Sequence, residues 1–265
     1  MSTLPVTFPR VPLEQMDPAL LWFELDRETH RVMPQDRELI TSTASMASFL
    51  HREQTRFVRG AMERVPYIEH PLRVALRLIR WGVRDAELVA AALLHDVAED
   101  CSEELLEVFG SAGRSCGQPT DGADEDAFGC LAHLYGTRVA GLVADVTNPK
   151  TCGSSSAEGR ANYLAHIETL VEQMGLSLLI KASDLKDNAG SIKYQLGHGK
   201  DARMLRMLTK YLPAARHVAD GMFVMATLEQ PADIEIAVRN AASDMQRLVL
   251  DLERLAFAYD IVKPS

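Results

Sequence analysis

Four ionisable side chains crowd the segment LLHDVAED, residues 93–100. His95 and Glu99 stand four positions apart, as do Asp96 and Asp100, so a helix would bring the members of each pair onto one face. The residues before them are apolar, which predicts that the group lies at one end of a buried helix. Unpaired buried charge is costly, and a divalent cation or a solvated cleft would offset that cost.

Imidazole and carboxylate ligands together suit Mn, Fe or Zn better than Ca. A histidine followed by an aspartate on a helix is also common as a local hydrogen bond or a surface feature. Residues 93–100 by themselves therefore leave metal binding and a structural role both open.

Two further segments favour the metal. His70 lies in PYIEHP, residues 66–71, directly before a proline that disfavours helical backbone in the residue preceding it. We therefore expect His70 to project from an extended loop where a helix starts. Asp184 follows the apolar run LSLLI and is expected at the margin of a buried helix, with Asn188 four positions later. A histidine, then a His-Asp pair, then an aspartate, in this order along the chain, indicates a metal site more specifically than any one of these segments alone.

The chain resembles the HD superfamily, and within it the hydrolase domain of Rel/Spo-type alarmone enzymes and their small stand-alone relatives. The matching segments are HREQTR (51–56), PYIEHPLRVA (66–75), AALLHDVAED (91–100) and KASDLKDN (181–188). The second and third segments match most specifically, both in their residues and in the length of sequence between them. In the fourth, the family commonly has alanine where Ser183 stands.

This resemblance implies an all-helical fold with one bound Mn²⁺, for which Zn or Fe are alternatives. The ligands that it implies are His70, His95, Asp96 and Asp184. His51 is a weaker rival as a ligand, because it falls at the family's position for a histidine that does not bind the metal.

The resemblance also implies roles in the reaction. Glu99 and Asp100 match the acidic pair that orients and activates the attacking water. Arg56 matches an arginine that packs on the guanine base, and Asn188 matches a residue that contacts the nucleotide. The implied reaction is Mn-dependent hydrolysis of the 3′-pyrophosphate of (p)ppGpp to pyrophosphate and GDP or GTP, in which Glu99 is placed to act as general base.

The elements that must position these residues have the periodicity of helices. Pro71 suits the first turn of a helix that runs to about Arg80 and ends at Gly82. Asp85 suits the N-cap of the helix that leads to His95. An apolar stripe near the C-terminus follows spacings of three and four residues, at Met245, Leu248, Leu252, Leu255 and Tyr259.

The fold class predicted is therefore all-α, an HD-domain helical bundle. We expect a single hydrolase domain over residues 37–265, with residues 1–36 as an extension packed on it that contains a helix-like stretch from Pro18 to Arg31. Residues 110–126 and 148–159 are rich in Gly and Ser and are expected to be loops. The first forms most of an insertion at about 110–130, near the active site, and either a lid or a surface insertion is compatible with it.

Composition narrows the range of partners. A net charge of −9 does not favour a protein that wraps nucleic acid, so a small-molecule nucleotide is the expected partner. No apolar run is long enough for a membrane span. The first residues lack a basic start followed by an apolar stretch, and we expect a cytoplasmic location. The sequence leaves an oligomer open.

The four cysteines do not form a metal-binding or disulfide pattern. Cys101, Cys116, Cys130 and Cys152 include no pair with two residues between them. Reduced thiols are the expectation, and zinc held by Cys116, Cys130 and His133 is the weaker alternative.

Two other functions stay open at this stage. The segment between Arg56 and His70 is longer than the family usually has, which favours an HD phosphohydrolase with another nucleotide substrate, such as a modified alarmone or NADPH. The second is a catalytically idle HD module that acts as a binding partner or an antitoxin. The intact acidic pair Glu99 and Asp100 favours an active enzyme over the idle module.

Overall fold

The computed structural model describes residues 11–56, 64–113, 123–150, 156–196 and 201–259. Within these ranges the chain is almost entirely helical, which confirms the predicted all-α fold. The α-helices are α1 (Pro18–Val32), α2 (Arg37–Leu50), α3 (Glu69–Trp81), α4 (Ala86–Leu94), α5 (Val97–Asp100), α6 (Ser102–Gly113), α7 (Ala123–Tyr135), α8 (Thr137–Val146), α9 (Ala157–Gln173), α10 (Ser177–Gly190), α11 (Asp201–Met225) and α12 (Glu235–Ala258).

Short elements complete the described ranges. β1 (Thr55–Arg56) and β2 (Val65–Pro66) pair antiparallel, with Thr55 opposite Pro66 and Arg56 opposite Val65. The 3-10 helices are η1 (Leu13–Gln15), η2 (Pro34–Asp36) and η3 (Ile192–Tyr194).

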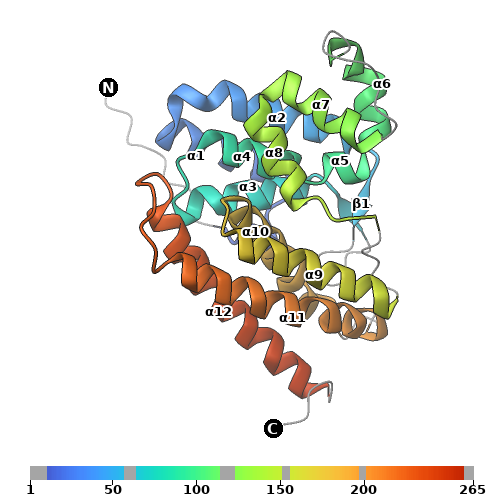
Figure 1. The fold of residues 1–265 in the computed structure, drawn as a ribbon, viewed down its shortest axis with the longest axis vertical. Helices are drawn as coiled ribbons and strands as arrows, with labels where there is room; N and C mark the ends of the chain where they lie inside the picture. The colour runs from blue at the N-terminus through green and yellow to red at the C-terminus, as the bar shows by residue number, and fades with distance from the viewer. Residues whose placement is uncertain (1–10, 57–63, 114–122, 151–155, 197–200, 260–265) are drawn as a thin grey trace, which may run out of the picture.

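The helices form two groups that meet at the centre of the molecule (Figure 1). One group contains α1 to α4 together with α7 and α8, and the other contains α9 to α12. Helix α10 joins the two groups, because it packs against α3, α4 and α8 on one side and against α11 and α12 on the other. Side chains from distant parts of the sequence therefore meet where α3, α4 and α10 come together.

The two helices that position the sequence-predicted histidines, α3 and α4, lie deep in the core. Helix α4 is AELVAAALL, apolar on nearly every side except Glu87, and it is surrounded by other helices. The side chain of Asp85 caps its start by accepting a hydrogen bond from the backbone N–H of Leu88 at 3.1 Å, as predicted. Helix α3 ends at Gly82, whose φ of 120° is one that other residues rarely adopt, and this also agrees with the prediction.

Helix α1 confirms the helix predicted near Pro18 to Arg31. Asp17 caps it through the N–H of Leu20 at 2.8 Å. Arg80 of α3 then ties α1 to the core, since its guanidinium contacts Glu28 at 2.9 Å and Glu24 at 3.2 Å. The division into an extension over 1–36 and a domain over 37–265 stays a prediction.

Two local expectations, at His70 and at Tyr259, are wrong. His70 is not in extended backbone, because α3 already begins at Glu69 and the N–H of His70 bonds to Tyr67 at 2.9 Å. Pro71 fits there because the first turn of a helix needs no partner for its missing N–H. The C-terminal stripe is buried at Met245, Leu248 and Leu252, but Tyr259 lies beyond the end of α12 and is 40% exposed.

The predicted loops are shorter than expected. Helix α6 continues to Gly113 and α7 starts at Ala123, so residues 110–113 and 123–126 are helical. Acidic residues at 124–126 favour the first turn of a helix, which outweighs the loop-like composition. Residues 157–159 are also helical, since Ser156 caps α9 through the N–H of Gly159 at 2.9 Å. Residues 114–122, where a lid was considered, lie outside the described ranges.

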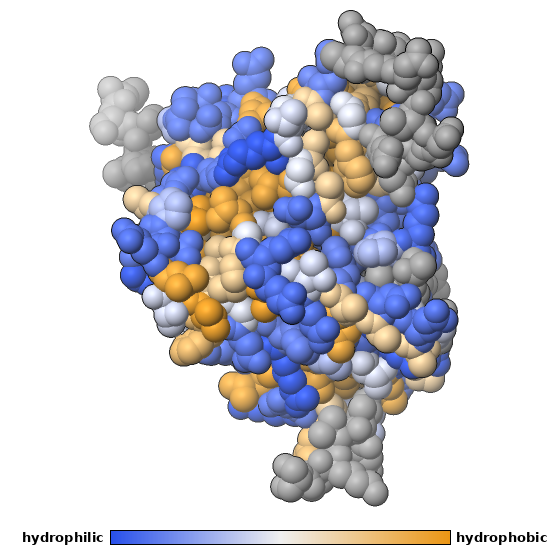
Figure 2. Space-filling model, in the orientation of Figure 1, coloured by the Kyte–Doolittle hydropathy of each residue, from blue (hydrophilic) through white to orange (hydrophobic). Residues whose placement is uncertain are grey.

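The surface carries hydrophobic patches separated by hydrophilic residues on the face drawn in Figure 2. Among the helices of the described ranges, none combines the length and the apolar character needed to cross a membrane.

Candidate metal centre

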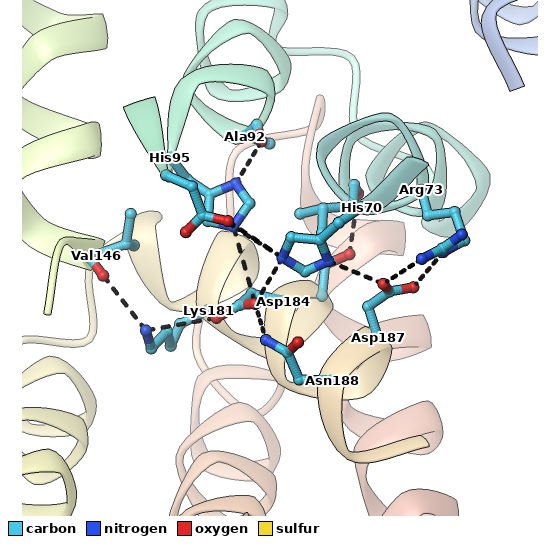
Figure 3. Close-up of polar contacts among 12 residues, drawn as sticks. His70, Arg73, Ala92, His95, Val146, Lys181, Asp184, Asp187 and Asn188 are labelled. Carbon is cyan, nitrogen blue, oxygen red and sulfur yellow. Dashed lines mark hydrogen bonds and ion pairs between the residues drawn. The ribbon is translucent and has the colours of Figure 1, made fainter. Parts of the chain in front are cut away.

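Three buried side chains from distant parts of the sequence converge on one point. His70 lies in the first turn of α3, His95 directly follows α4, and Asp184 lies in the middle of α10. One atom from each lies within 4.8 Å of the others, and the described residues form no other such group of metal-ligand side chains. Figure 3 shows the two imidazole rings pointing toward one another above Asp184.

The distances between these donors fit the edges of a coordination shell. The Nε2 atoms of His70 and His95 are 3.2 Å apart, and Asp184 Oδ1 lies 3.2 Å from the first and 3.8 Å from the second. Asp96 Oδ2 lies 3.4 Å from His70 Nε2 and 3.1 Å from His95 Nε2. Ligands that are each about 2.0–2.2 Å from one metal ion lie about 3 to 3.6 Å apart. These separations fall within that range except the 3.8 Å between His95 Nε2 and Asp184 Oδ1, and Asp96 is outside the group of three whose donor atoms all lie within 4.8 Å of one another.

The outer ring nitrogens of both histidines are held by the protein. His95 Nδ1 lies 2.9 Å from the carbonyl oxygen of Ala92, which can only accept, so this nitrogen carries a proton. His70 Nδ1 lies 2.8 Å from Asp187 Oδ2 and donates to it in the same way. Each Nε2 therefore faces the centre, which is the arrangement that a metal-binding histidine requires.

The charges around this point favour a cation. Burial would lower the pKa of His95, but the carboxylates of Asp96 and Asp184 raise it to about 9. Burial would raise the pKa of Asp184, but Lys181 and the two histidines lower it to about 2. The carboxylates thus stabilise positive charge between the imidazoles, and the donor set fits a divalent transition metal without deciding which one.

Asp184 is held in one orientation by its own helix. Asn188 donates from Nδ2 to Asp184 Oδ1 at 2.5 Å, and Lys181 Nζ lies 3.5 Å from Asp184 Oδ2. Lys181 is 2% exposed. The Lys181 ammonium group therefore neutralises part of the charge of Asp184 inside the protein.

Behind His70, away from the metal point, lies a buried ionic network. Asp187 accepts from Arg73 Nε at 2.8 Å and from Arg77 Nη2 at 3.0 Å, while Arg73 also contacts Glu69 at 2.9 Å. Burial would raise the pKa of Asp187, but these arginines and His70 hold it well below its usual range. The carboxylate that orients His70 is therefore ionised.

Tyr67 and His51 form the wall beside Asp96. The hydroxyl of Tyr67 donates to Asp96 Oδ2 at 2.7 Å, and burial together with that carboxylate raises the pKa of Tyr67 well above its usual range. The His51 ring stacks on Tyr67 with 4.8 Å between centroids. His51 Nδ1 pairs with Gln54 Oε1 at 2.8 Å, and His51 is absent from the group of metal-ligand atoms in the described residues. Its arrangement favours a wall residue over a ligand.

The acidic pair lies just past the metal ligands, in α5. Glu99 Oε2 accepts two hydrogen bonds from Asn148, from the backbone N–H at 3.2 Å and from Nδ2 at 3.0 Å. Burial and the nearby Asp96 raise the pKa of Glu99 above its usual value. The same two causes, together with Glu99, raise the pKa of Asp100 to about 6. Asp100 can therefore exchange a proton near neutral pH, and the raised pKa of Glu99 makes its carboxylate a stronger base than an ordinary glutamate.

The two residues predicted to contact substrate lie together. Arg56, in β1, donates from Nη2 to Asn188 Oδ1, and Asn188 reaches Asp184 with its other amide atom. The Arg56 guanidinium also lies 5.4 Å from the centroid of the Tyr67 ring. The hairpin thereby places a cation beside the metal point, and residues 57–63 of its turn lie outside the described ranges.

Sequence reasoning did not identify the ionic network around Asp187, nor Tyr67 and Asn148. Asp187 stands three positions after Asp184 in α10. In α3, Glu69, Arg73 and Arg77 stand at intervals of four among mostly apolar residues. That row of charges in a buried helix was the available signal for an internal ion network. Tyr67 and Asn148 carried no such signal, because only tertiary packing brings them to the site.

The alternative zinc site has no support within the described residues. Cys130 is buried with a raised thiol pKa, His133 is exposed on the same helix, and Cys116 lies outside the described ranges. Cys101 is also a free, buried thiol.

Comparison with known proteins finds relatives of one kind. A probable guanosine-3′,5′-bis(diphosphate) 3′-pyrophosphohydrolase of Mycoplasma pneumoniae is 26% identical over 223 residues, which are 81% of this chain and 26% of that protein. A guanosine-3′,5′-bis(diphosphate) 3′-pyrophosphohydrolase of Aquifex aeolicus is 33% identical over 60% of this chain and 18% of its own length. One from Drosophila melanogaster is 31% identical over 54% of this chain and 63% of its own length.

The chain thus spans about a fifth to a quarter of these two bacterial proteins and under two thirds of the fly protein. No family model and no solved structure matches it.

Proposed function

We propose that this chain, a distant homologue of the guanosine-3′,5′-bis(diphosphate) 3′-pyrophosphohydrolases, is a divalent-metal-dependent hydrolase of the 3′-pyrophosphate of ppGpp or pppGpp. The proposed metal is Mn²⁺, and the proposed ligands are His70, His95, Asp96 and Asp184. The observation that supports this most directly is the 3.2 Å approach of the two Nε2 atoms, with Asp184 Oδ1 3.2 Å from His70.

When bound, the divalent ion would lower the pKa of a water molecule and polarise a phosphoryl oxygen. Glu99 is the proposed general base, because it lies one turn past His95 and because burial and Asp96 raise its pKa, which strengthens it as an acceptor of a proton from the attacking water. The water adds its oxygen to the phosphorus next to the ribose, and the bond from that phosphorus to the 3′-oxygen breaks. Asp100, with a pKa of about 6, is the proposed source of the proton that the 3′-oxygen takes up.

Arg56 and Asn188 are the proposed substrate contacts. Their mutual hydrogen bond fixes the guanidinium plane next to the metal ligands. A planar cation can stack on a purine base or pair with a phosphate, so it can orient the nucleotide in either way.

The test is a substrate panel with purified protein, with and without Mn²⁺. ppGpp, pppGpp and NADPH are each incubated, and products are separated by anion-exchange chromatography. The proposal expects pyrophosphate with GDP or GTP, and no turnover after metal removal. Release of phosphate from NADPH without turnover of ppGpp would replace the proposed substrate by another nucleotide.

One substitution distinguishes the loss of the proposed general base from the loss of the bound metal. Glu99→Gln is expected to retain the metal and lose turnover, with Glu53→Gln, which is 84% exposed in its side chain, as the matched control. Undiminished turnover in Glu99→Gln would remove Glu99 from the mechanism. Metal binding without turnover of any of the three nucleotides in the wild-type chain would instead favour an idle module.

A further inference from the structure

Asn148 occupies the space between the proposed general base and the metal-binding helix. It lies two residues after α8 ends, in the connection toward α9. On one side its backbone N–H and its Nδ2 donate to Glu99 Oε2, at 3.2 Å and 3.0 Å. On the other side its Oδ1 accepts from Lys181 Nζ at 3.0 Å.

These contacts fix which way the amide group of Asn148 faces. An ammonium group only donates, so the oxygen of the amide must face Lys181 and the nitrogen must face Glu99. Lys181 is itself anchored, because it also donates to the carbonyl oxygen of Val146 at 3.3 Å and lies 3.5 Å from Asp184 Oδ2 (Figure 3). A continuous polar chain therefore runs from Asp184 through Lys181 and Asn148 to Glu99.

The two carboxylate oxygens of Glu99 have different hydrogen-bond contacts with Asn148. Both donors of Asn148 go to Oε2, which leaves Oε1 as the oxygen able to take a proton. Glu99 lies at the surface of the site on the four-residue helix α5, and its side chain would otherwise have several rotamers. A fixed carboxylate removes that freedom before the reaction begins.

We propose that Asn148 is a positioning residue for Glu99, which orients the carboxylate and keeps it ionised, an inference that rests on the proposed function. It acts through Glu99 and does not itself touch reacting atoms. Donors to a carboxylate favour its charged form, and so does the nearby charge of Lys181, whereas Asp96 and Asp100 oppose it. Tyr211 also faces Glu99, whose charge raises the pKa of the Tyr211 hydroxyl.

The kinetic test uses Asn148→Ala and the near-isosteric Asn148→Leu, with Asn240→Ala as a matched control that loses a side-chain bond to Trp81 O far from the site. We expect kcat for ppGpp to fall about 10- to 100-fold with KM and bound metal nearly unchanged. The acid limb of the pH–kcat profile should move to higher pH. Equal kcat and an unmoved acid limb in both variants would overturn the inference.

A second measurement does not depend on substrate. Protein with ¹³C-labelled glutamate carboxyl carbons is titrated by NMR in the metal-free state, with the Glu99 signal assigned from its loss in Glu99→Gln. The pKa of Glu99 should be higher in Asn148→Ala and Asn148→Leu than in the wild-type chain and in Asn240→Ala. An unchanged pKa contradicts the role of Asn148 whatever the substrate. A raised pKa in a chain that releases no pyrophosphate from ppGpp supports that role and rejects the proposed substrate.

Discussion

His70 lies between two aspartates that stand one turn apart in α10. Its Nδ1 is 2.8 Å from Asp187 Oδ2, and its Nε2 is 3.2 Å from Asp184 Oδ1. One carboxylate thus orients the ring and the other faces the metal point. Because the arginines of α3 hold Asp187, the orientation of His70 depends on the packing of α3 against α10.

Replacing Asp187 should weaken metal binding without removing a ligand. In Asp187→Asn the amide is a poorer acceptor for His70 Nδ1, so we expect the Kd for Mn²⁺ to rise about 10- to 100-fold. Isothermal titration of metal-free protein measures this. Asp251→Asn, an exposed aspartate near Lys193, is the control. A Kd within twofold of the wild-type value would show that Asp187 does not tune the site.

The ionic network behind His70 should be essential to stability. Arg73 is fully buried and contacts both Glu69 and Asp187. Arg73→Met leaves two buried carboxylates short of a cation, and we expect the free energy of unfolding to fall by about 3–5 kcal/mol. Urea denaturation checks this against Arg239→Met, whose pair with Glu235 is exposed. A loss as small as that of the control would contradict the importance of the network.

Arg56 should contribute to substrate affinity more than to metal affinity. Arg56→Ala removes the guanidinium that Asn188 holds beside the metal ligands. We expect KM for ppGpp to rise about tenfold or more, the effect of losing one bond to a charged group, with Mn²⁺ affinity unchanged. Steady-state kinetics compares it with Arg52→Ala, whose arginine pairs with Glu104. An unchanged KM would exclude Arg56 from substrate contact.

Asp85 should make stability depend on acid pH at a place remote from the metal. Burial would raise its pKa, but the bonds from Arg138 and from the start of α4 lower it below the ordinary value of 3.8. A lowered pKa stabilises the fold above the unfolded-state value, and this is lost as pH falls through the folded-state value. Arg138 is 43% exposed in its side chain, so the contribution is about 0.5–1 kcal/mol.

The comparison for Asp85 is Asp85→Asn, which retains an N-cap residue but not the charge. The wild-type advantage in free energy of unfolding should be constant from pH 7 to 5 and shrink toward pH 3. Urea denaturation at these three pH values measures it. A wild-type advantage that grows as pH falls would show that folding raises the pKa of Asp85 instead of lowering it.

Local rules were sufficient for much of the fold. The cap at Asp85 and the turn at Gly82 depend on short-range geometry, so their residue types predict them. The errors came where tertiary packing outweighed a local preference, as at His70, which is helical in spite of Pro71. The loop-like composition near 110 and 157 hid helix ends for a related reason, since glycine and serine also occur in terminal turns.

The site, too, contains residues that the sequence predicted and residues that only tertiary packing brings into place. The type and order of His70, His95, Asp96 and Asp184 predicted a cluster that the structure brings together. Tyr67 and Asn148 were not predicted, because each reaches the site from a connection whose path depends on the packing of helices far apart in sequence.

Metal content and turnover measured in the same samples test whether His70, His95, Asp96 and Asp184 hold a catalytic metal ion. Wild-type chain and Asp96→Ala are loaded with Mn²⁺, freed of excess metal and analysed by mass spectrometry for bound metal and by chromatography for pyrophosphate from ppGpp. We expect one bound Mn²⁺ per wild-type chain with turnover, and neither metal nor turnover in Asp96→Ala. Stoichiometric Mn²⁺ in Asp96→Ala, or pyrophosphate release by metal-free wild-type chain, would contradict this expectation.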